Sequence, residues 1–254
     1  MKIPTSKLLT SATTLAGLLF VANPASAFDP SVFQSFIQKE RQAVDPAKVN
    51  LFQLDPAKLN LIYDHEVKVH FLSEGAAFRN QFGATVTGTT NINDTILFDE
   101  ISCLTASCST LTGYQQPGIG SSTIAKGGLT AGESVSLGNV TAGSTLDFWL
   151  NANGFLKPNA TRWSTDTAKN KDGLQHVMAY EYEDYLVLAW EDLVRGGDQD
   201  YNDAVFAIDI GKANLQKIRE ESQDVPEPST TAALLGVMAF GLSRLRRRQD
   251  LDVN

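Results

Sequence analysis

The sequence is poor in cysteine, histidine and basic residues. Its 254 residues include 2 Cys and 3 His, and 21 Lys and Arg stand against 29 Asp and Glu, giving a formal net charge of −8. Two cysteines cannot complete a thiolate metal site, and an acidic chain lacks the basic face that binds nucleic acid phosphates. Six of the bases lie in the two terminal segments, so the remainder is still more acidic. Composition excludes nucleic acid as the main partner and favours cations.

Sequence signatures of common enzyme classes are also missing. No Gly-rich phosphate loop occurs, and the segment 132–136 lacks the final Gly of a nucleophile elbow. His65 and His70 are one residue too far apart for the zinc helix motif, and on a strand they face opposite sides, which predicts two surface histidines. Glu181 and Asp184 leave a glycan-active hydrolase as an alternative. The sequence predicts a protein that is not an enzyme.

Residues 1–27 have the layout of a secretory signal peptide. Lys2 and Lys7 precede an apolar stretch over residues 8–22, and Ala25 and Ala27 satisfy the small-x-small cleavage rule. The apolar stretch is short for a bilayer span, which disfavours the alternative of a membrane anchor. Cleavage by signal peptidase would leave Phe28 as the first residue of the exported protein.

The C-terminal segment, residues 225–248, has three parts. Pro226, Glu227 and Pro228 are followed by an apolar, small-residue helix candidate at about 230–243, and then by a cluster of arginines. This layout resembles the PEP-CTERM sorting signal of Gram-negative bacteria. The resemblance implies a short transmembrane helix that anchors the protein transiently in the inner membrane, cleavage by an exosortase, and transfer to the cell surface or extracellular matrix. An ordinary C-terminal anchor is the alternative.

Between these signals the hydrophobic periodicity predicts a mainly β protein. Residues 28–62 are predicted as a short helical segment, because Phe33, Phe36 and Ile37 recur at helical spacing. From residue 63 onward apolar and polar residues alternate in short runs separated by turn residues, as in strands. The predicted strands are 67–71, 84–89, 95–98, 134–137, 145–150, 176–180, 186–190 and 204–210, with a surface loop at 157–173 and a linker at 213–224. This pattern favours a jelly-roll-like antiparallel β-sandwich over residues 63–212.

The two cysteines are close neighbours in the sequence. Cys103 and Cys108 are separated by four residues. In an exported protein such a pair favours a small-loop disulfide. A metal-binding pair is the alternative, although no further cysteine could complete the site.

The acidic stretch WEDLVRGGDQDYND at residues 190–203 carries the clearest chemical signal. Its five carboxylates, set against the single base Arg195, are Glu191, Asp192, Asp198, Asp200 and Asp203. Such crowding is costly unless a cation neutralises it. Calcium binds about six to eight hard oxygens, and Asp198, Asp200 and Asn202 offer them at alternating positions. The stretch therefore predicts a calcium site, with a solvated acidic turn as the alternative.

The spacing does not match an EF-hand. Asp203 stands where the turn glycine of that motif belongs, and Asp209 lies within a strand pattern instead of at a helix start. A different calcium-binding loop is therefore expected.

Five segments together resemble the DUF4114 domain family of secreted bacterial proteins. They are FLSEGAAFRNQFG at 71–83, LTAGESVSLG at 129–138, FWLNANGF at 148–155, DGLQHV at 172–177, and the acidic stretch. The resemblance covers about residues 63–212 and implies a β-sandwich with a calcium-stabilised loop. By this resemblance, the acidic calcium-binding positions of the family correspond in this sequence to Glu191, Asp192, Asp198, Asp200, Asn202 and Asp203.

We expect a non-catalytic surface or matrix protein with a structural or adhesive role. Calcium is the expected cofactor, and polysaccharide or other surface proteins are the expected partners. A calcium-dependent carbohydrate-binding module is the main alternative, since exposed aromatic side chains could stack on sugars. The candidates are Trp149, Trp163 and Tyr201, of which Trp163 lies in the most polar surroundings.

Overall fold

The computed structural model describes residues 28–37, 43–44, 51–101 and 129–223. The predicted signal peptide, the cysteine pair and the PEP-CTERM segment with its membrane helix lie outside these residues. Among the helices that are described, none combines the length and the apolar character needed to cross a membrane.

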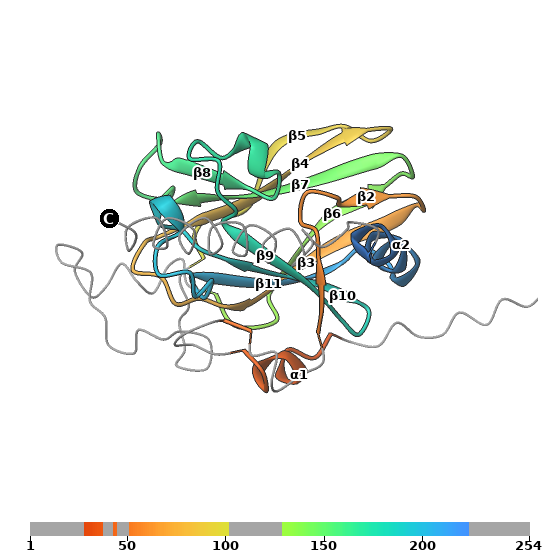
Figure 1. The fold of residues 1–254 in the computed structure, drawn as a ribbon, viewed down its shortest axis with the longest axis horizontal. Helices are drawn as coiled ribbons and strands as arrows, with labels where there is room; N and C mark the ends of the chain where they lie inside the picture. The colour runs from red at the N-terminus through yellow and green to blue at the C-terminus, as the bar shows by residue number, and fades with distance from the viewer. Residues whose placement is uncertain (1–27, 38–42, 45–50, 102–128, 224–254) are drawn as a thin grey trace, which may run out of the picture.

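Two antiparallel sheets pack face to face (Figure 1). The larger sheet consists, in spatial order, of β1 (Phe52–Leu54), β9 (Val177–Tyr182), β10 (Tyr185–Trp190), β11 (Ala204–Asp209), β3 (His65–Ser73) and β6 (Ser134–Val140). The smaller sheet contains β2 (Asn60–Leu61), β7 (Ser144–Ala152), β4 (Gln81–Gly88) and β5 (Ile92–Phe98), and β8 (Thr161–Ser164) also pairs with β7. The predicted antiparallel β-sandwich is confirmed, and each predicted strand falls on an observed one.

The main core lies between the two sheets. Alternate residues of each strand point inward, so that Phe71 and Phe206 of the larger sheet meet Phe82 and Phe148 of the smaller one. The rings of Phe82 and Phe206 stack at 3.9 Å between centroids. All four rings are fully buried, so burial of aromatic surface joins the two sheets.

A second apolar cluster covers the outer face of the larger sheet. Phe33 and Phe36, from the segment around helix α1 (Ser31–Gln34), pack there against Val187 of β10 and Val205 of β11. Figure 1 places α1 below this sheet, on the side away from the smaller sheet. Strands β10 and β11 are therefore buried on both faces, which explains their nearly continuous apolar sequences.

The helical prediction for residues 28–62 is largely wrong. Among the described residues of this segment, 28–37, 43–44 and 51–62, only Ser31–Gln34 forms an α-helix, and residues 52–54 and 60–61 are strands that pair with β9 and β7. The helical spacing of Phe33, Phe36 and Ile37 reflects burial against the sheet. Pairing at the sheet edges gives the backbone N–H and C=O groups of residues 52–54 and 60–61 hydrogen-bond partners, whereas a short isolated helix is only marginally stable.

Residues 213–224 were expected to form a linker, but residues 212–223 form helix α2 (Lys212–Gln223). Leu215 and Ile218 of α2 are buried in the main core. The Asn214 carboxamide accepts hydrogen bonds from the backbone N–H groups of Ile62 and Tyr63, both at 2.9 Å. These tertiary contacts stabilise a helix that the polar sequence did not reveal.

Two further predictions are also corrected. Strand β8 (Thr161–Ser164) and the 3₁₀ turn Thr167–Lys169 lie within the predicted surface loop 157–173. His70 is not a surface residue, because it is 4% exposed and its ring stacks on that of Phe28 at 3.7 Å. Phe28 lies more than forty positions before His70, and Tyr185, whose ring also contacts it, lies more than a hundred positions after it, so strand alternation alone did not reveal its burial.

Candidate metal centre

The acidic loop, residues 191–203, connects β10 to β11. These strands pair in register up to Trp190 and Ala204, and the Asp203 N–H donates to the Trp190 carbonyl at 3.1 Å. Glu191 and Asp203 therefore stand opposite each other where the ladder ends. The 3₁₀ turn Val194–Gly196 lies in the middle of the loop. The loop lies at the end of the sandwich opposite α2 (Figure 1).

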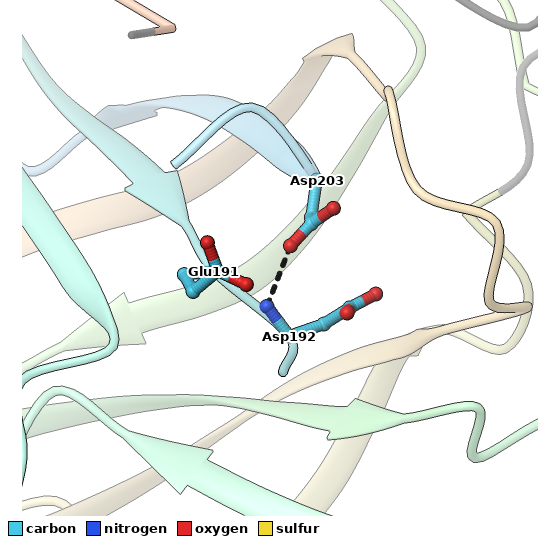
Figure 2. Close-up of side chains that lie close together, drawn as sticks. All are labelled: Glu191, Asp192 and Asp203. Atoms are coloured by element: carbon cyan, nitrogen blue, oxygen red, sulfur yellow. Dashed lines mark hydrogen bonds between the residues drawn. The ribbon is translucent and has the colours of Figure 1, made fainter. Parts of the chain in front are cut away.

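Three carboxylates gather at the base of the loop. One oxygen each of Glu191, Asp192 and Asp203 lies within 4.8 Å of the others. Figure 2 shows them around the backbone of Asp192, whose N–H donates to Asp203 Oδ2 at 2.6 Å. Glu191 is 1% exposed and Asp192 is 4% exposed. Burial of adjacent carboxylates is unfavourable for their ionised forms, and a bound cation relieves this penalty.

A second carboxylate group lies further out along the same loop. Glu191 also approaches Asp198 and Asp200, again with ligand oxygens within 4.8 Å of one another. Asn202 lies beside this group, since its backbone N–H and its side-chain amide both donate to the Asp200 carboxylate. The structure thus brings together the five predicted carboxylates, and Asn202 contacts them through Asp200.

Glu191 is shared by both groups, and its carboxylate is enclosed by the backbone of the loop. The N–H of Leu193 donates to Oε1 at 3.1 Å and that of Gln199 to Oε2 at 3.2 Å. Gly197 adopts φ +48°, and a Cβ atom there would lie 2.0 Å from Glu191 Oε1. The loop therefore closes around this carboxylate only because residue 197 has no side chain.

The electrostatics of the cluster favour protonation or cation binding. Burial, together with the nearby Asp203 carboxylate, raises the pKa of Glu191 to about 8. Burial also raises the pKa of Asp203, with Asp192 as the next cause, and it raises the pKa of Asp192 despite a hydrogen bond from Asn80. Among the described residues, no Lys or Arg side chain forms an ion pair with these three carboxylates.

Residues outside the acidic stretch hold its backbone in place. The indole of Trp163 donates to the Asp192 carbonyl at 2.8 Å, and its ring stacks on that of His176 at 3.6 Å. His176 Nδ1 lies 3.2 Å from the Glu191 carbonyl oxygen. Trp163 comes from β8 and His176 precedes β9, so two separate segments position the first carboxylates.

Asp172 joins this support from the other side. Its carboxylate lies 3.0 Å from His176 Nε2 and accepts a hydrogen bond from the Arg195 N–H at 2.9 Å. Burial opposes ionisation of Asp172, but hydrogen bonds from Arg195 and Leu174 outweigh it and lower its pKa to about 2. A stable negative charge here links the 172–176 segment to the acidic loop.

Asn80 is a support residue that sequence analysis missed. It directly precedes β4, is fully buried, and donates from its side-chain amide to Asp192 Oδ2 at 2.7 Å. Its side-chain oxygen accepts from the Asn153 N–H at 2.7 Å. Asn80 and Asp192 are 112 positions apart, so no local pattern could reveal their contact.

Two of the three candidate sugar-stacking residues are buried. Trp163 is fully buried below the acidic loop and Trp149 is 1% exposed, so neither offers a free ring face. Glu181 and Asp184, the residues of the hydrolase alternative, form ion pairs with Arg219 and Lys212. These side chains have structural partners.

One family model matches the part of the chain that contains the acidic loop. Residues 140–211 match the family model described as "Domain of unknown function (DUF4114)". The DUF4114 match runs from the end of β6 to just beyond β11 and contains the whole acidic loop. The resemblance to DUF4114 is confirmed for this segment. No curated protein and no solved structure matches the chain.

Proposed function

We propose that the acidic loop binds calcium and that the protein is a non-catalytic, exported protein with a structural or adhesive role. The observation that carries the proposal is the convergence of Glu191, Asp192 and Asp203 at the end of two buried strands. Five carboxylates in one loop supply hard oxygen ligands and no nitrogen or sulfur ligand. This ligand set suits calcium, which accepts irregular shells of six to eight oxygens, better than zinc or strictly octahedral magnesium.

Calcium would act by fixing the loop that connects β10 to β11. Its ligands extend from the end of β10 to the start of β11, and Asp192 accepts a hydrogen bond from Asn80, which directly precedes β4 of the smaller sheet. A cation would replace repulsion among these carboxylates by attraction and would rigidify this end of the sandwich. Such a role needs no catalytic residue, which is why we favour a structural protein.

Export rests on the two terminal sorting signals, and one structural feature supports it. Phe28, the predicted first residue after signal peptide cleavage, packs its ring against Phe33, His70 and Tyr185. The mature chain would thus begin with a residue that the fold uses. We infer processing by signal peptidase and exosortase, transient anchoring at the inner membrane, and final location at the cell surface or in the extracellular matrix.

A melting experiment tests the calcium proposal. The purified protein is heated with calcium, with magnesium and with a chelator, and its metal content is determined by elemental analysis. We expect calcium to raise the melting temperature more than magnesium does. An unchanged melting temperature in chelator, together with the absence of bound metal, would show that the loop is a solvated turn.

Mass spectrometry tests the export proposal separately. Protein recovered from the cell surface should begin at Phe28 and should lack the arginine cluster that ends at Arg248. A host that lacks its exosortase should retain the protein at the inner membrane. Surface protein that keeps the arginine cluster would contradict the PEP-CTERM assignment.

A further inference from the structure

A pocket of about 470 Å³ opens where β5 ends and β6 begins. Its polar lining includes Arg79, Asp99, Glu100 and Glu133, and its apolar lining includes Phe98 and Phe155. This volume falls in the range of sites for small organic molecules. The pocket contains none of the residues that sequence analysis selected for sugar binding.

The pocket has a preformed charged floor and one exposed ring. Arg79 and Glu100 form a buried ion pair, at 8% and 7% exposure. The Arg79 guanidinium also lies 4.1 Å from the centroid of the Phe155 ring, which is 39% exposed. The ion pair and the stacked guanidinium hold one side of Phe155, while its remaining surface is open to a ligand.

Two carboxylates at the rim are oriented by hydrogen bonds and retain acceptor capacity. Asp99 Oδ1 accepts from the Gln81 side chain at 2.6 Å. Glu133 Oε1 accepts from the backbone N–H of Thr130 at 3.0 Å and from its hydroxyl at 2.7 Å. An ionised carboxylate can accept about four hydrogen bonds, so both groups can accept more from ligand hydroxyls.

Asn80 connects this pocket to the metal centre. Its amide holds Asp192, its side-chain oxygen holds the Asn153 N–H, and its backbone carbonyl accepts from Ile101. The neighbouring Arg79 donates its N–H to Asn153 Oδ1 at 3.3 Å, and its carbonyl accepts from the Phe155 N–H at 3.1 Å. The positions of Arg79 and Phe155 therefore depend on the same residue that contacts the metal-binding carboxylate.

We propose that this pocket binds a neutral saccharide and that calcium in the metal centre strengthens the binding through Asn80. A sugar combines an apolar C–H face, which packs on an aromatic ring, with hydroxyls that donate to carboxylates. Among the described residues that line the pocket, three carboxylates stand against one arginine, which disfavours an anionic ligand. The coupling part of this inference rests on the proposed calcium site.

Saturation-transfer NMR with free sugars tests the inference on the purified protein. The probes are glucose, galactose, mannose and N-acetylglucosamine, with glucuronic acid as the anionic comparison. We expect at least one neutral sugar to give a signal in calcium, a weaker signal in chelator, and no comparable signal from glucuronic acid. Phe155→Ala should weaken the affinity at least tenfold. Leu156→Ala alters a neighbour of similar exposure, 44% against 39%, that is not among the described lining residues, and it should leave the affinity unchanged.

Each outcome separates this inference from the proposed function. Melting with calcium and chelator shows for every variant whether the fold and the metal response are intact. If calcium raises the melting temperature but no neutral sugar binds, or if Phe155→Ala leaves sugar binding unchanged, the saccharide site is wrong while the calcium site stands. Equal sugar affinity in calcium and in chelator would refute the coupling through Asn80. Absence of any calcium effect on melting would refute the proposed function itself.

Discussion

Replacing Asp203 by asparagine should have opposite effects with and without calcium. Burial and the neighbouring Asp192 raise the pKa of Asp203 to about 8. The folded protein thus holds this proton more tightly than the unfolded chain does, and stability falls as the pH rises from the ordinary aspartate pKa toward 8. At pH 7.4, about 3.6 units above the ordinary aspartate pKa of 3.8, the penalty is on the order of 5 kcal/mol, because each unit corresponds to about 1.4 kcal/mol.

Asparagine keeps the acceptor and removes the charge. Its side-chain oxygen can still accept from the Asp192 N–H, which now bonds to Asp203 at 2.6 Å. Its amide can donate to Glu191, whose ligand oxygen lies within 4.8 Å. In chelator, Asp203→Asn should therefore be more stable than the parent by part of this penalty.

In calcium the same variant should lose most of the stability that the parent gains from binding the ion. A site with a dissociation constant of roughly 0.1–1 mM stabilises the parent by about 0.4–1.4 kcal/mol in 1 mM calcium. The Asp203→Asn variant should gain much less, because one ligand charge is gone.

Urea denaturation at pH 7.4, in chelator and in 1 mM calcium, measures both effects. Asp147→Asn serves as the control, since it breaks the ion pair with Lys169 on the smaller sheet. It should lower the free energy of unfolding in both conditions and leave unchanged the increase that calcium produces. If Asp203→Asn destabilises the protein in chelator, the electrostatic argument for the cluster is wrong.

Three further predictions concern the metal centre. Gly197→Ala should weaken calcium binding at least tenfold in a titration, because the added Cβ would lie 2.0 Å from the Glu191 carboxylate. Gly173→Ala is the control: Gly173 also has a positive φ, but an added Cβ would meet no atom within 4 Å, so calcium binding should be unchanged. Calcium affinity should be lower at pH 6 than at pH 8.5, because the raised pKa of Glu191 makes the ion compete with a proton; pH-independent titrations would contradict this. Trp163→Phe should lower the free energy of unfolding by about 1–3 kcal/mol in denaturation experiments, because it leaves the buried Asp192 carbonyl without its donor. Trp149→Phe should lower it less, because the Trp149 indole N–H has no partner among the described residues.

Local sequence pattern predicted the strands and the acidic loop because both depend on neighbouring residues. Alternation in Val67, Val69 and Phe71 marks a strand wherever it pairs. Crowded carboxylates between two apolar runs mark a hairpin loop suited to a cation, and the pairing of β10 with β11 brings Glu191 and Asp203 together. These features needed no knowledge of distant contacts.

The tertiary structure decided what depends on partners far away in the chain. The polar sequence of α2 forms a helix because Leu215 and Ile218 enter the core, and the segment around Phe33 is ordered by the outer face of a sheet built from later residues. Asn80 became a support for the metal centre only when folding placed it against Asp192, 112 positions away. Sequence determined the strand periodicity and the charge of the loop, whereas burial of these groups required the packing of segments that no local pattern relates.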